Sequence, residues 1–217
     1  EMNIRNRFAR SQGISNEIPN KQLASEIVGS SDEASIREIL QILRESKKPN
    51  ELSDGLKVLE MVGEQNPGLL ADAFTPVFML LQHTQNKIQW RAMSALSTFS
   101  FLHHATTFDN LGIILDLMDQ GSVITRDHGV KILIGLYKED AYRRNIGPLL
   151  LEQVTAAPDN QLGQYAEKWM PVITREDRAK LIHVLEMRQP ELVNPSHQKR
   201  ISRVLLKLHR SQKNFEP

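Results

Sequence analysis

Three adjacent polar residues, Arg126, Asp127 and His128, have side chains of the kinds that carry chemistry. A cation, a carboxylate and an imidazole are the groups of a proton shuttle or a metal site. They lie in the segment QGSVITRDHGVKILIGLY, which we predict to be helical. Neighbouring residues on a helix point about 100° apart, so these three side chains cannot converge on one ligand. We interpret them as scaffold, with Arg126 bonded to neighbouring turns and Asp127 near the positive end of the helix.

Residue patterns typical of enzymes and metal sites are missing from the rest of the sequence. The chain has no cysteine, no Gly-x-Ser-x-Gly motif and no phosphate-loop pattern, and none of its seven histidines is followed by glutamate. His103 and His104 with Asp109 are a candidate metal site, although a turn between helices is the favoured interpretation. We therefore expect no catalytic residue, no metal and no cofactor.

The composition is that of an ordinary soluble globular protein. Of 217 residues, 40% are hydrophobic and 24% are charged, and the formal net charge is +1. This charge provides no general attraction to nucleic acid or to an acidic membrane surface. No stretch approaches the roughly 20 apolar residues that span a bilayer. We expect a cytoplasmic protein that does not insert into membranes.

A pattern of residues recurs every 37 positions along the chain. Small residues recur at this spacing, at Gly55, Ala92, Gly129 and Ala166. Four positions after each of them stands a large apolar residue: Leu59, Leu96, Leu133 and Met170. The intervening segments also repeat, and turn-forming Pro, Asn and Gly separate the copies. Each copy therefore predicts two helices, and because one short pair cannot bury its apolar face alone, neighbouring pairs must stack.

The predicted fold is all-α, a right-handed superhelix of about five helical pairs. The pairs are expected at residues 32–66, 68–104, 107–139, 141–171 and 174–213. Residues 1–31 depart from the repeat and are expected to form an N-terminal arm and, over 19–30, a capping helix for the first pair. The repeat domain then spans residues 32–213, and residues 214–217 form a tail.

The second copy carries a pattern like that of a known repeat family. In KIQWRAMSALSTF an aliphatic Ile88 is followed by the small residue Ala92 and by Ala95-Leu96, which resembles the HEAT repeat. On this alignment Arg126 falls where HEAT repeats usually carry an arginine, but the equivalent positions in other copies do not keep it. The resemblance covers about 180 residues; it implies a HEAT-like α-solenoid and says little about function.

In a HEAT-like solenoid the second helix of each pair lines the concave face, where a partner binds. The non-core positions of these helices supply the predicted partner-binding residues: Trp90, Met93, Asp127, Lys131, Lys168, Arg200 and Arg203. Trp90 lies off the apolar stripe, and an exposed Trp beside a Met is typical of a binding anchor. The alternative is that Trp90 packs against a neighbouring helix or the N-terminal arm. Trp169 falls in a core column and is predicted to be buried.

Charge is distributed unevenly along the sequence. Residues 175–213 contain ten Lys and Arg against four Asp and Glu, whereas residues 31–174 contain thirteen against eighteen. Such polarity orients an acidic partner through its long-range field. A solvated terminal helix explains the same composition.

The leading functional hypothesis is a non-catalytic scaffold that binds another protein or a peptide through the concave face. The alternative is a DNA-binding protein similar to the HEAT-like alkylpurine DNA glycosylases, because Trp90 and Asp127 fall in one column, one repeat apart. The acidic middle of the chain argues against this alternative, since duplex binding requires several phosphates to be neutralised. A lyase acting on a tetrapyrrole carrier, as in some HEAT proteins, has no supporting residue.

Overall fold

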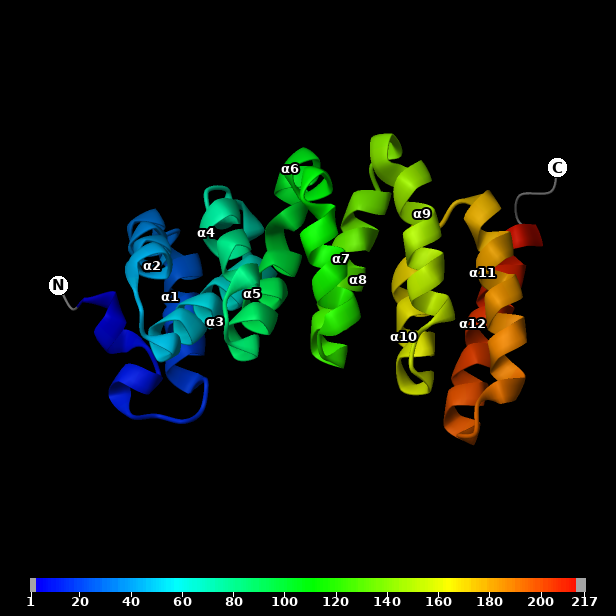
Figure 1. The fold of residues 1–217 in the computed structure, drawn as a ribbon, viewed down its shortest axis with the longest axis horizontal. Helices are drawn as coiled ribbons and strands as arrows, with labels where there is room; N and C mark the ends of the chain where they lie inside the picture. Colours follow the sequence, from blue (N-terminus) through cyan, green and yellow to red (C-terminus); the bar gives the residue numbers. More distant parts are fainter. Residues whose placement is uncertain (1–2, 214–217) are drawn as a thin grey trace. The chain divides into compact units, whose positions relative to one another are not determined.

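The computed structural model describes residues 3–213, with the side chains of residues 3–210. The predicted tail at 214–217 lies outside the described residues. Within them every regular element is a helix and no strand occurs, which confirms the predicted all-α fold (Figure 1). The chain forms two compact units, residues 1–132 and 133–217. None of the described helices is both long and apolar enough to cross a membrane.

The helices of the first unit follow the predicted pairs. The first two pairs are α2 (Glu33–Glu45) with α3 (Pro49–Gln65), and α4 (Phe74–Met79) with α5 (Asn86–Phe99). Short 3-10 turns flank α4, namely η3 (Pro67–Leu70) and η4 (Leu80–Gln82). The next repeat has three helices after the turn η5 (Ser100–His103): α6 (His104–Asp109), α7 (Leu111–Gln120) and α8 (Val123–Tyr137), whose last residues belong to the second unit.

The second unit contains the last two pairs. They are α9 (Asp140–Thr155) with α10 (Asp159–Trp169), and α11 (Arg175–Arg188) with α12 (Pro195–Lys213), the latter joined through the turn η6 (Gln189–Glu191). Trp169 is buried, as predicted, and its ring meets the ring of Tyr137 edge-on at 5.4 Å between centroids. The Tyr137 hydroxyl donates to Asp177 Oδ2 at 2.8 Å and accepts from the Thr174 amide at 3.0 Å. These bonds hold the start of α11 against the end of α8.

The residues before the first pair form a cap. Helix α1 (Ile18–Ser30) covers α3, close to the predicted 19–30 (Figure 1). The expected arm is packed as well, since it forms two 3-10 turns, η1 (Ile4–Arg7) and η2 (Arg10–Gln12), and Phe8 between them is fully buried. The Phe8 ring packs near Gly55 of α3, where an added Cβ would lie 3.7 Å from its Cζ, an ordinary contact distance. The segment therefore buries the apolar face that the first repeat would otherwise expose.

Close helix packing explains two glycines of the repeat. A Cβ at Gly129 would lie 2.3 Å from the side chain of buried Met118, so its expected role in close packing of α7 on α8 is confirmed. The helices approach even more closely at Gly63 of α3, because a Cβ there would lie 1.9 Å from Oγ1 and 2.7 Å from Cβ of Thr98 on α5. Thr98 is β-branched and its hydroxyl donates to the Ala95 carbonyl, so it cannot easily turn away.

Gly63→Ala is expected to lower the free energy of unfolding by about 2–3 kcal/mol, because α3 and α5 must separate to admit the methyl group. Gly29→Ala is the matched control: this glycine is exposed on α1 with no atom within 4 Å of an added Cβ, so alanine should stabilise by up to about 1 kcal/mol. Urea unfolding of both variants measures the difference. Equal stability of the two variants would contradict the packing described.

Candidate functional site

The polar triad of α8 takes part in packing between helices. Arg126, Asp127 and His128 are all half-buried, and His128 Nδ1 lies 3.3 Å from the hydroxyl of Ser97 on α5. The Ser97 hydroxyl also donates to the Ser94 carbonyl. The described residues contain no group of three His, Asp or Glu side chains that could hold a metal ion.

The candidate metal ligand His103 is engaged in the fold of the first unit. Its Nε2 lies 2.7 Å from the Ala71 carbonyl oxygen, and its ring packs 5.3 Å from the ring of Phe74. It thus joins the turn η5 to the start of α4, which agrees with the favoured interpretation of this segment as a turn between helices.

The predicted partner-binding residues of the first unit have different environments. Trp90 is half-buried on α5, with the Arg91 guanidinium 4.8 Å from its ring centroid. Lys131 is exposed and Asp127 half-buried on α8. The prediction that Met93 lies on the surface is wrong, since its side chain is 0% exposed. Helix α5 contacts α3 on one side and α4 with its flanking turns on the other, so the buried arc is wider than an amphipathic stripe predicts.

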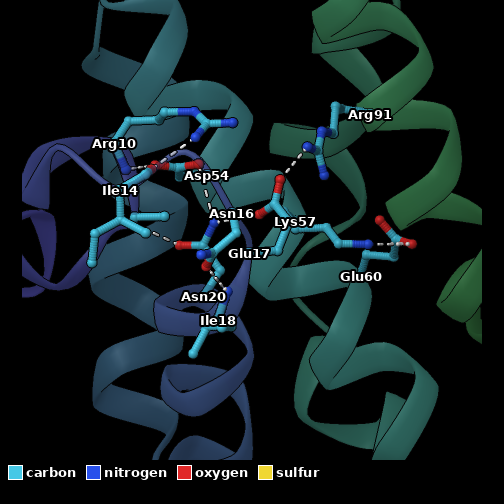
Figure 2. A network of polar contacts seen from close by, with 11 residues as sticks. Arg10, Ile14, Asn16, Glu17, Ile18, Asn20, Asp54, Lys57, Glu60 and Arg91 are labelled. Atoms are coloured by element: carbon cyan, nitrogen blue, oxygen red, sulfur yellow. Dashed lines mark hydrogen bonds and ion pairs between the residues drawn. The ribbon is translucent and has the colours of Figure 1, made fainter.

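A network of buried polar side chains joins the cap to α3 (Figure 2). Asn20 of α1 is 0% exposed; its Oδ1 accepts from the Ala9 amide, and its Nδ2 donates to Asp54 Oδ1 at 3.1 Å and to Glu17 Oε2 at 2.7 Å. The Arg10 amide donates to the other oxygen of Asp54 at 2.8 Å. The buried polar groups of Asn20 and Asp54 thus have partners, which is the condition for keeping them in the core.

The network continues through Glu17 onto α5. Arg91 Nη2 donates to Glu17 Oε1 at 2.6 Å, and Lys57 of α3 adds a second positive charge nearby while pairing with Glu60 at 3.1 Å (Figure 2). Burial raises the pKa of Glu17, but the hydrogen bonds from Asn20 and Arg91 and the two cations outweigh it. The net effect is a pKa below the ordinary value of 4.5.

The sequence did not lead us to this network, although it contains a signal for it. Asp54, Arg91 and His128 each precede a small residue of the 37-residue repeat, so three polar residues occupy one column beside the helix-packing positions. All three proved to be polar links between elements of the first unit. No such pattern pointed to Glu17 as a member of the network, because this residue lies in the non-repeating segment.

The predicted residues of the second unit lie on α10 and α12. Arg200 binds Glu167 through both Nε, at 3.0 Å, and Nη2, at 2.6 Å, in a bidentate ion pair. Gly163 makes this possible, because a Cβ there would lie 2.7 Å from Cδ of Arg200. The hydrogen bond from Arg200 lowers the pKa of Glu167, and Arg203 and Lys207 add to the effect. Arg203 and Lys168 are exposed.

Helix α12 presents a row of cations. Its sequence contains six Lys or Arg residues and no Asp or Glu. Four of these side chains are exposed and spaced four, four and three residues apart, which places them on one face: Lys199, Arg203, Lys207 and Arg210. We call these four residues the α12 basic ridge. Beside Lys199 a hollow of about 440 Å³ opens between η6 and α12, lined also by Pro190 and Pro195.

Comparisons with known proteins show the fold. The sequence matches no protein-family model and no curated protein. A designed armadillo repeat protein is similar in structure over 87% of this chain and 90% of its own, with 15% identity and a TM-score of 0.63. An engineered protein is similar over 96% of this chain and 97% of its own, with 13% identity and a TM-score of 0.58. The chain is therefore a helical repeat solenoid.

The likeness does not single out the HEAT family. HEAT repeats have two helices and armadillo repeats have three. The α6–α7–α8 repeat has three helices, with a short one before the longer pair, whereas the repeats of the second unit have two. The chain thus combines features of both types.

Glu17 makes stability depend on pH. The pKa of Glu17 is lower in the folded state than its ordinary value of 4.5. The carboxylate therefore contributes fully to the free energy of unfolding above about pH 4.5, and this contribution is lost as the pH falls through the folded-state pKa. Glu17→Gln should therefore be less stable than the wild type at pH 7, and the difference in free energy of unfolding should shrink toward pH 3. Urea unfolding at both pH values measures it. A difference that stays constant would show that the carboxylate is not responsible.

Proposed function

We propose that this protein is a non-catalytic scaffold of HEAT-like and armadillo-like repeats that binds an acidic segment of a partner protein through its second helices. The α12 basic ridge is the observation that carries the proposal. Its four cations are exposed on one face of a helix that carries no acid along its length, so their charge acts outward on a ligand.

The spacing of the ridge fits an extended peptide. Lys199, Arg203 and Lys207 follow one another at one-helical-turn intervals, about 6 Å apart along the axis. Alternate residues of an extended chain lie about 6.6 Å apart on one side. A peptide with acidic residues at alternate positions therefore places one carboxylate near each cation. The hollow beside Lys199, with its two prolines, receives an adjacent side chain.

Second helices of the first unit supply the apolar part of the recognition. Trp90 retains part of its ring surface in solvent, and exposed Lys131 lies on the next second helix. A rigid aromatic surface next to charged groups is the usual composition of an interaction hot spot. Met93 no longer belongs to this set because it is buried.

Nucleic acid is the less favoured ligand. Residues 31–174 carry an excess of acidic groups, which repels an extended phosphate backbone. Helix α12 also contains no Phe, Tyr or Trp on which an unpaired base could stack. The same binding experiment distinguishes the two ligands when duplex DNA replaces the peptide.

Reversal of the ridge charge tests the proposal. An eight-residue fluorescent peptide that alternates glutamate and serine should bind the wild type, and Arg203→Glu/Lys207→Glu should weaken its binding by at least about tenfold in Kd, as measured by fluorescence anisotropy. The control is Arg144→Glu/Arg175→Glu, which makes the same charge change at exposed arginines of α9 and α11. Equal losses in both variants, or tighter binding of duplex DNA than of the peptide, would overturn the proposal.

The role of Trp90 has its own test. Trp90→Ala should reduce recovery of at least one partner in an affinity pulldown quantified by mass spectrometry, because truncation of a hot-spot aromatic commonly costs about 2 kcal/mol or more. The ring is half-buried, so thermal unfolding of the variant must first show that the fold is retained. An unchanged set of partners from a folded variant would remove Trp90 from the binding surface.

A further inference from the structure

Arg91 and Arg200 bind carboxylates in different ways. Arg200 uses both Nε and Nη2 on Glu167, which is the bidentate geometry that makes arginine–carboxylate pairs strong. Arg91 offers the same edge to Glu17 but uses Nη2 alone. The residue is only 7% exposed, and its buried Nε has no hydrogen-bond partner. One donor of a buried arginine is therefore left unsatisfied.

The reason lies in the competing bond of Glu17. Its second oxygen, Oε2, accepts from Asn20 Nδ2 at 2.7 Å and is turned away from the Arg91 Nε (Figure 2). With one oxygen bonded to Asn20 and the other to Arg91 Nη2, the Glu17 carboxylate leaves the Arg91 Nε without an acceptor. Glu17 is thus a geometrically imperfect ligand for this arginine. A carboxylate free of that connection can accept from Nε and Nη2 together.

The surroundings of Arg91 favour an acidic ligand. Lys57 contributes a second positive charge at Glu17, and the Trp90 ring lies against the guanidinium at 4.8 Å and fixes its plane. If Glu17 leaves, Glu60 remains paired to Lys57, and Arg91 loses the carboxylate to which its Nη2 donates. An uncompensated buried cation is costly, so another carboxylate is strongly preferred in its place.

The segment that carries Glu17 is a short non-helical link between η2 and α1. Residues 13–17 begin at Gly13, which adopts a left-handed φ of 71°. The Ile14 amide donates to the Ala9 carbonyl, the Arg10 guanidinium donates to the Ile14 carbonyl, and the Ile18 amide donates to Asn16 Oδ1, so these bonds stay within the cap. The Glu17 side chain is 30% exposed.

We infer that the Nε–Nη2 edge of Arg91, with Lys57 and Trp90 beside it, is a binding site for an acidic side chain of the partner, and that Glu17 occupies it as a built-in competitor. This inference rests on the proposed function, because the ligand is of the same chemical kind, an acidic segment. It adds a second binding position, in the first unit. Glu17 weakens ligand binding at this position until the loop at residues 13–17 is displaced. The fraction of molecules with the site open sets the apparent affinity.

Removal of the competing carboxylate tests the inference. The alternating glutamate–serine peptide should bind Glu17→Gln about tenfold more tightly than the wild type in the anisotropy assay. Glu26→Gln is the matched control, because it removes the same charge from the same cap at an ion pair with Arg7 away from the site. The double variant Glu17→Gln/Arg91→Gln should lose the gain. Equal affinities of Glu17→Gln and Glu26→Gln would overturn the inference.

The outcomes separate this inference from the proposed function. Binding by the wild type that depends on the α12 basic ridge but not on Glu17 overturns the inference alone. Absence of peptide binding in every variant overturns both. If Glu17→Gln does not fold, Glu17→Asp keeps the charge and shortens the side chain, and it should still bind the peptide more tightly than the wild type. A folded Glu17→Asp protein with wild-type affinity would also overturn the inference.

Discussion

The close approach of α3 to α5 is the contact on which the first unit depends. Gly63 and Thr98 meet where no Cβ fits, and α3 also contacts α1 and α2, so side chains are buried around its whole circumference. Apolar residues gain from this burial, but Asp54 and Glu60 are buried with them. Charged groups in such positions require partners, and this requirement shapes the N-terminal cap.

The cap meets the requirement with main-chain and side-chain donors. Amides of Ala9 and Arg10 enter the network through Asn20 and Asp54, while the buried Phe8 ring packs near Gly55. A polar network of this kind specifies one position for the segment, since a shift would leave several buried groups unpaired. The same network delivers Glu17 to Arg91, so the cap and the proposed binding site share one set of bonds.

The two units differ in the environment of the cations on their second helices. In the first unit Lys57 and Arg91, on the second helices α3 and α5, form ion pairs within the chain. In the second unit Arg200 of α12 pairs with Glu167, and the four side chains of the α12 basic ridge are exposed. Ion pairs at such exposed positions contribute little to stability, so selection for folding does not explain a row of like charges. The acidic ligand that we propose would give this row a function.

Much of the fold was predictable because burial imposes a period. The 37-residue spacing predicted the helical pairs, the burial of Trp169 and the packing role of Gly129. The site was less predictable. Met93 was placed on the surface by an amphipathic pattern, but contacts on both sides of α5 bury it. The packing of residues 3–17 escaped notice because a non-repeating segment has no copies with which to compare it.

By itself, the sequence determined the repeat, the helical class of the chain and the cationic character of α12, since these follow from residue type and spacing along one helix. Only the tertiary structure decided which charges are neutralised. Glu17 reaches Arg91 and Glu167 reaches Arg200 across 74 and 33 residues of sequence. Such pairs depend on how closely segments distant in sequence approach one another, which a local sequence pattern does not specify.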